Sequence, residues 1–161
     1  MMNANHGQLD DPITAAEVEA GIPERYRCFF LVSAADLNRQ CLPVVESFWE
    51  AVRVFSPAAR LACPAQIILA ARPFRITLGS GVLEYHPYEK TISAAIEHFV
   101  FLDVGRLLQL LRPLQVACIV EEFVHALMHV ADESLVALIV AHLYHGVVLR
   151  DGRYTVADSA T

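Results

Sequence analysis

The clearest pattern in this chain is an apolar stretch between 116 and 132 whose polar side chains return at helical spacing. Wound as a helix at about 100° per residue, these polar side chains occupy one stripe roughly 100° wide. All of them are acids or histidines: Glu121, Glu122, His125, His129 and Asp132. The rest of the circumference is apolar. The pattern therefore predicts a largely buried helix over 113–131, with Pro113 at its first position, where proline is favoured.

Two more segments have apolar residues at helical spacing. The first is Leu37–Val54, in which Pro43 either kinks the helix or marks its true start. The second is Leu135–His145, which Asp132 or Ser134 can cap at its beginning. Helices are therefore expected both early in the chain and directly after the helix with the polar stripe.

The middle of the chain changes to short apolar or alternating runs. Turn-forming residues separate these runs, notably at Gly79–Gly81 and Pro87–Glu89. Strands are predicted at Gln66–Ala70, Phe74–Leu78, Val82–His86 and Lys90–Ser93. Tyr26–Val32 suits either a strand or the run-in to a helix, and 147–156 predicts a terminal hairpin with an Asp-Gly turn. We expect a small, largely antiparallel sheet of three or four strands in the middle of the chain.

In sequence order, these elements are a helix, a meandering sheet, the helix with the polar stripe and a second helix. We therefore predict an α+β fold, in which a small, mostly antiparallel sheet packs against the central helix and the helix that follows it. The length of 161 residues suits one domain, assigned to 23–156. Residues 1–22 are expected to form a mobile N-terminal segment with one short helical piece, and 157–161 a tail.

Composition narrows the class of protein. Hydrophobic residues make up 55% of the chain and charged residues 19%. The share of apolar residues is higher than in an average soluble protein. The surplus of apolar residues would suit a homodimer. There is no transmembrane-length apolar run, and residues 1–11 do not resemble a signal peptide, so a cytoplasmic location without membrane contact is expected. The net charge of −6 and the dispersed basic residues disfavour nucleic acid as a partner. The four scattered cysteines indicate reduced thiols rather than a disulfide framework.

The polar stripe also carries the candidate chemistry. Buried carboxylates and imidazoles need partners, and one metal ion can satisfy several of them at once. Glu121-Glu122-Phe123-Val124-His125 resembles the HExxH signature of zincin metallopeptidases, with Glu121 in the place of the first histidine. The resemblance covers roughly residues 65–146, because the strands before the helix look like the sheet edge that precedes the active helix in small zincins.

The resemblance implies a role for each position of the motif. Glu121 and His125 would bind zinc or another divalent transition metal, and Glu122 would be the general base that activates a water molecule. The third ligand would come from downstream, with His142 favoured slightly over His129. A carboxylate in place of an imidazole lowers the net charge of the site and weakens its Lewis acidity. The first hypothesis is therefore a metal-dependent hydrolase, or a divergent metalloenzyme, that acts on a peptide or small-molecule substrate.

Two other functions fit the same residues. The chain would be a catalytically inactive, zincin-like binding or regulatory module if the replacement of the first histidine marks a loss of chemistry. It would be a di-iron carboxylate protein if Glu122 and His125 belonged to one of two ExxH motifs, but the sequence contains only one. The same residues also have ordinary structural roles, as a solvated acidic face, as hydrogen-bonded core histidines, or as histidines at a helix end, such as His142 and His145.

Overall fold

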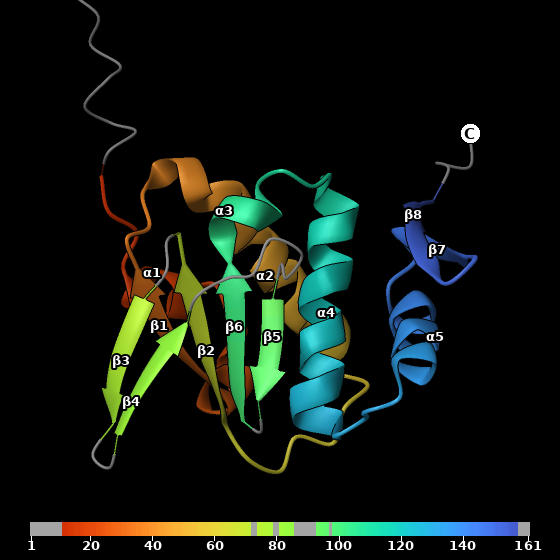
Figure 1. Cartoon of the computed structure of the whole chain (residues 1–161), viewed down its shortest axis with the longest axis horizontal. Coiled ribbons are helices and arrows are strands. Elements are labelled where there is room, and N and C mark those ends of the chain that lie inside the picture. The colour runs from red at the N-terminus through yellow and green to blue at the C-terminus, as the bar shows by residue number, and fades with distance from the viewer. Residues whose placement is uncertain (1–10, 72–73, 79–80, 86–92, 97, 158–161) are drawn as a thin grey trace, which may run out of the picture.

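The main sheet is built around β2 (Ala65–Ala70), a strand with one polar residue. β2 pairs in parallel with β1 (Phe30–Ala35) on one side and with β6 (Phe99–Asp103) on the other, and β5 (Ser93–Ile96) pairs antiparallel with β6. The strand order is β1-β2-β6-β5 (Figure 1). The computed structural model describes residues 11–71, 74–78, 81–85, 93–96 and 98–157.

The α+β class is confirmed, but the predicted antiparallel meander is wrong. β3 (Phe74–Leu78) and β4 (Gly81–Tyr85) form an antiparallel hairpin that is a separate two-stranded sheet. All residues of β2 except Gln66 are buried, and a strand buried on both faces is typical of a parallel sheet. The predicted turns at 79–80 and 87–89, and the predicted strand residues 86 and 90–92, lie outside the described residues.

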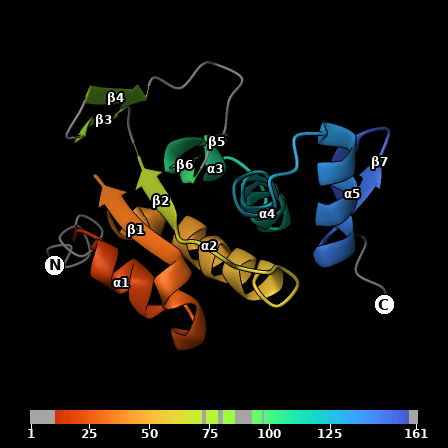
Figure 2. The ribbon, with the colours of Figure 1, turned by 90° about the horizontal axis from the view of Figure 1, so that it is seen from below.

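α2 (Leu42–Phe55) connects β1 to β2 and lies against one face of the sheet, next to α4 (Arg112–Met128) (Figure 2). Pro43 stands in the first turn of α2, where its missing N–H leaves no intrahelical bond unmade, so it begins the helix rather than kinking it. The buried Ser47 hydroxyl donates a hydrogen bond of 2.7 Å to Gln115 Oε1 and joins α2 to α4. Two 3₁₀ helices, η1 (Glu24–Phe29) and η2 (Arg39–Cys41), precede β1 and α2.

The folded domain begins before residue 23. Thr14 and Glu17 form a capping box at the start of α1 (Ala15–Ala20), and α1 packs against β1. Three apolar side chains of this region, Ile13, Val18 and Ile22, are buried in the core. The part of the predicted mobile segment from 13 to 22 therefore belongs to the domain, and 1–10 lies outside the described residues.

The helices after the sheet are α3 (Val104–Leu107), α4 and α5 (Glu133–Leu143), and the last two follow in the predicted order. α4 ends at Met128, before the predicted Ala131, because His129 takes the left-handed conformation with φ 56°. Asp132, one of the two predicted caps, is the N-cap of α5, and its carboxylate accepts a hydrogen bond of 2.8 Å from the Leu135 N–H. α4 thus lies between the sheet and α5, as Figures 1 and 2 both show.

The terminal hairpin is also confirmed. β7 (Val147–Arg150) pairs antiparallel with β8 (Arg153–Val156). The turn residues Asp151 and Gly152 have φ of 50° and 73°, which a type I′ turn requires of both central residues. The hairpin packs against α4 and α5, and residues 158–161 of the predicted tail lie outside the described residues.

Phe123 lies in the core where the sheet meets α2 and α4. Its ring centroid is 5.3 Å from that of Phe30 on β1, 6.1 Å from that of Phe48 and 5.5 Å from that of Phe55 on α2. These are favourable separations for tilted and edge-to-face aromatic pairs. The face of α4 opposite the polar stripe therefore holds the helix against the rest of the domain.

Part of the apolar surplus remains at the surface. Leu111, Leu135 and Leu138 are exposed, the last two on α5. Among the described residues no single helix has the length and hydropathy to cross a membrane; α4 and α5 meet that criterion only as a pair, and the pair is bent by 117°. The homodimer expected from composition stays a prediction.

Candidate metal centre

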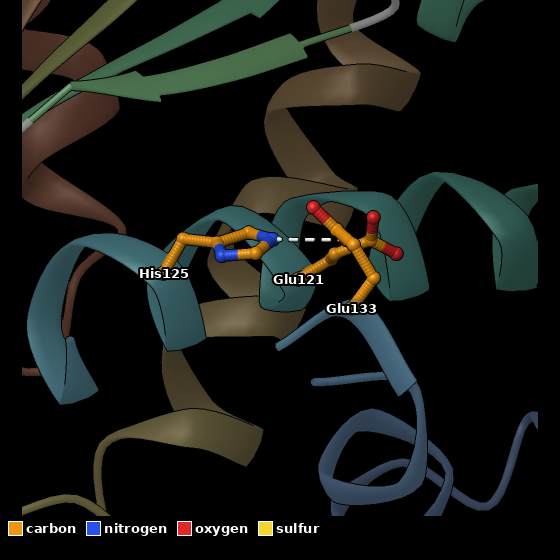
Figure 3. A group of neighbouring side chains, drawn as sticks. All are labelled: Glu121, His125 and Glu133. Carbon is orange, nitrogen blue, oxygen red and sulfur yellow. Dashed lines mark ion pairs between the residues drawn. The ribbon is translucent and has the colours of Figure 1, made fainter. Parts of the chain in front are cut away.

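Three side chains converge where α4 ends and α5 begins. Glu121 and His125 project from the same face of α4, one helical turn apart, and Glu133 is the first residue of α5 (Figure 3). One potential ligand atom from each residue lies within 4.8 Å of the other two, so the group could hold a metal ion. The left-handed residue His129 and the Asp132 cap reverse the chain between the two helices and so place Glu133 opposite the stripe.

The ring of His125 is held in one orientation by the backbone. Its Nδ1 lies 2.7 Å from the carbonyl oxygen of Val130. Because a carbonyl oxygen only accepts hydrogen bonds, Nδ1 must carry the proton and donate. In the neutral ring Nε2 then has a free lone pair, and it lies 3.5 Å from Glu133 Oε2. Histidines that bind metals usually donate their second ring N–H in this way to a carbonyl or carboxylate.

The charges of the group do not cancel. Two carboxylates face one neutral imidazole lone pair, and among the described residues neither Glu121 nor Glu133 forms an ion pair with an arginine or lysine. The negative charge of the group falls only if it takes up protons or binds a cation, and a divalent cation would cancel it.

Burial makes the ionised form of Glu121 costly. Desolvation raises the pKa of the Glu121 carboxyl above its ordinary value of 4.5, the nearby Glu133 raises it further, and attraction to the Tyr154 hydroxyl and to His125 opposes the rise. The Tyr154 hydroxyl oxygen is itself buried and lacks a hydrogen bond of good geometry. Burial and Glu121 also raise the pKa of Tyr154, so the phenol stays protonated and can only donate to the Glu121 carboxylate.

Glu121→Gln should therefore stabilise the metal-free protein while removing a ligand. Because the folded-state pKa of Glu121 is raised, its ionisation destabilises the fold, and stability is lost as the pH rises above about 4.5. A neutral glutamine avoids that loss. We expect a higher melting temperature than wild type at pH 7 in the presence of chelator, and no difference near pH 4. Thermal unfolding at both pH values measures this, and a variant less stable at pH 7 would show that Glu121 is well compensated without metal.

Of the four predicted ligands, the structure brings two together and places the other two elsewhere. Glu121 and His125 are brought together, but His142 is exposed on α5 and does not belong to the group, and His129 is exposed with its ring beside that of His98. The third member of the group is Glu133. The resemblance implied a ligand from the following helix, and Glu133 has that position although it is not a histidine. A cap at Asp132 places Glu133 in the first turn of that helix, and this is the signal in the sequence that points to Glu133 as a ligand.

Glu122, the implied general base, lies elsewhere. It is 7% exposed and is not one of the three converging residues. Cys118 is a neighbour of the stripe and is inert, because burial and the negative charges of Glu121 and Glu122 raise the pKa of its thiol to about 12. The reactive groups that solvent can reach here are therefore Glu121, His125 and Glu133.

Comparison with known proteins identifies no relative. Neither a family model, nor a curated protein, nor a solved structure matches this chain. What the protein does is therefore argued from the chemistry of its own residues.

Proposed function

We propose that this protein binds one divalent transition-metal ion, zinc or a similar ion, through Glu121, His125 Nε2 and Glu133. The observation that carries the proposal is the convergence of two carboxylates on an imidazole whose Nδ1–H is already held by the Val130 carbonyl. A ligand histidine oriented in this way loses little freedom on binding, because its tautomer and ring orientation are set beforehand.

The distances suit such an ion. In a tetrahedral site with bonds of about 2.0–2.1 Å, two ligand atoms lie roughly 3.4 Å apart. His125 Nε2 and Glu133 Oε2 are 3.5 Å apart. The Glu133 side chain is 78% exposed and can adjust its position, whereas Glu121 and His125 are partly buried and the His125 ring is held by the Val130 carbonyl. A divalent ion would also cancel the charge of the two carboxylates.

The chemical role that follows is metal-assisted hydrolysis of a peptide or small molecule. Three protein ligands leave a position for a water molecule, which the metal would acidify. Tyr154 would donate a hydrogen bond to the ionised Glu121 and orient its carboxylate. Because Glu122 is buried outside the group, the proposal gives it no role as the base. Two carboxylates acidify water less than two imidazoles would, so slow turnover is expected.

The second candidate is a module without metal, in which the contact of 3.5 Å between His125 Nε2 and Glu133 Oε2 joins the end of α4 to the start of α5. This candidate corresponds to the catalytically inactive binding or regulatory module that the sequence also allows.

Calorimetric titration of metal-free protein with Mn²⁺ or Zn²⁺ distinguishes the two candidates. We expect one equivalent at this centre and a loss of affinity of at least about tenfold in Glu133→Gln, since even supporting residues of metal sites contribute that much. Glu24→Gln is the matched control, because Glu24 is also an exposed acid in the first turn of a helix. Equal binding in both variants, or none in wild type, would refute the proposal. Hydrolysis of a fluorogenic peptide panel by the loaded protein then tests catalysis separately.

A further inference from the structure

α5 is apolar on nearly all sides, yet only one of its sides is packed. Its polar residues are Glu133, Ser134 and His142. Val136 and Val140 are buried, on the side where α5 packs against α4 and the β7–β8 hairpin. Figures 1 and 2 show α5 at the edge of the molecule, with α4 between it and the sheet. A helix that is hydrophobic all round is normally buried all round, so the outer side of α5 lacks a partner within the described part of the chain.

The outer face of α5 consists of four exposed residues, Ser134, Leu135, Leu138 and His142. At about 100° per residue, their side chains fall within an arc of roughly 100°. Leu138 is 59% exposed and lies at the middle of the face. Ser134 and His142 lie four residues before and after it, on one ridge of the helix. The face therefore has an apolar centre and one polar side chain at each end.

The chain contains no further apolar segment that would suit this face. The longest stretches outside the described residues are 1–10, 86–92 and 158–161, and none of them has more than two consecutive apolar residues. A second copy of the chain, in contrast, offers an identical apolar centre. Closed symmetric dimers are the commonest oligomers, and their two-fold contacts join the same patch on both subunits.

We propose that two copies of this protein associate through the outer faces of their α5 helices, which pack antiparallel about a two-fold axis at Leu138. This arrangement places Leu138 against its own counterpart and Ser134 against His142 of the second copy. A hydroxyl and an imidazole can hydrogen-bond to each other. Parallel packing would instead place the two imidazoles together and align the two helix dipoles unfavourably.

The proposed contact is independent of the metal centre. Glu133 lies roughly 140° around the helix from Leu138, and it faces His125 on α4 rather than the outer side. Dimer formation and metal binding therefore use different sides of α5. Failure of either proposal leaves the other standing.

Sedimentation equilibrium of the full-length protein over a range of concentrations tests the association. Chelator in the buffer excludes a dimer bridged by metal. A single pair of helices is smaller than a standard interface, so we expect a weak dimer that forms only in concentrated protein. Leu138→Glu should raise its dissociation constant at least about tenfold, because two carboxylates would face each other at the axis. Leu111→Glu is the matched control, since Leu111 is 66% exposed but lies outside α5.

Disulfide cross-linking tests the geometry. Leu138→Cys should cross-link two copies in oxidising buffer, whereas Leu135→Cys should not. An antiparallel pair centred on Leu138 separates the two copies of residue 135 by about 9 Å along the helix axis, and a disulfide requires Cα atoms within about 7 Å. The wild-type chain has the same native cysteines and is the control for their cross-linking.

Three results would overturn the proposal. The first is a wild-type protein that stays monomeric at every concentration, which would leave the face to a different partner. The second is a dimer that Leu138→Glu weakens no more than Leu111→Glu does. The third is cross-linking of both cysteine variants, which would show parallel packing, or of neither. Circular dichroism of each variant establishes that a change in association does not reflect a lost fold.

Discussion

Mn²⁺ at 100 times its dissociation constant is expected to raise the free energy of unfolding of the wild-type protein by about 2.7 kcal/mol, and His125→Ala to abolish that gain. In a domain of this size the gain corresponds to an increase in melting temperature of roughly 5–10 °C. Mn²⁺ is the suitable ion because it prefers carboxylate and imidazole ligands to thiolates. His125 supplies the one nitrogen of the centre, and its removal leaves two carboxylates without an oriented third ligand.

The measurement is thermal unfolding with Mn²⁺ and with chelator, made on each variant. Comparing the two conditions within one variant cancels any direct effect of losing the His125–Val130 hydrogen bond. His142→Ala is the control, because His142 is exposed on α5 and lies outside the group. A His125→Ala protein that Mn²⁺ still stabilises by the wild-type amount would place the ion elsewhere. If Mn²⁺ failed to stabilise His142→Ala to the same extent, the third ligand would be His142, the residue that the sequence favoured.

Phe123→Ala is expected to destabilise the protein by about 3–5 kcal/mol. The Phe123 ring is fully buried and contacts the rings of Phe30, Phe48 and Phe55. Truncation leaves a cavity where β1, α2 and α4 meet, and those rigid elements can fill it only in part. Since α4 also carries Glu121 and His125, Phe123→Ala should weaken metal binding indirectly, through the position of the helix.

Urea denaturation with a two-state fit measures the change. Leu138→Ala is the control, because Leu138 is 59% exposed on α5, and truncations at exposed positions usually change stability by about 0.5 kcal/mol or less. A loss below about 1 kcal/mol for Phe123→Ala would show that the apolar side of α4 does not anchor the helix as the ring contacts indicate.

Local signals in the sequence predicted the elements around the centre. The stripe of acids and histidines gave the helix that became α4, the Asp132 cap gave the start of α5, and Asp151-Gly152 gave the final turn. Each of these depends on contacts between residues near in sequence. The pairing of Glu121 with His125 was predictable for the same reason, because it follows from helix geometry alone.

Long-range contacts were not predictable in the same way. Nothing local to Ala65–Ala70 shows that this strand pairs with Phe30–Ala35 and Phe99–Asp103, although its four consecutive apolar residues at 67–70 are a weak sign of burial on both faces. Likewise Glu133 joins the centre only because His129 ends α4 in the left-handed conformation and the chain turns back. A ligand set that spans two helices depends on how the helices dock. The hydrophobic periodicity of each helix carries no information about that docking.

Anomalous diffraction from crystals soaked in Mn²⁺ tests the central claim most directly. We predict a peak about 2.0–2.2 Å from a carboxylate oxygen of Glu121, from His125 Nε2 and from a carboxylate oxygen of Glu133, with the His125 Nδ1–H still donating to the Val130 carbonyl. Saturated crystals without a peak there, in which His125 and Glu133 remain paired with each other, would contradict the metal centre and leave an ion pair between two helices.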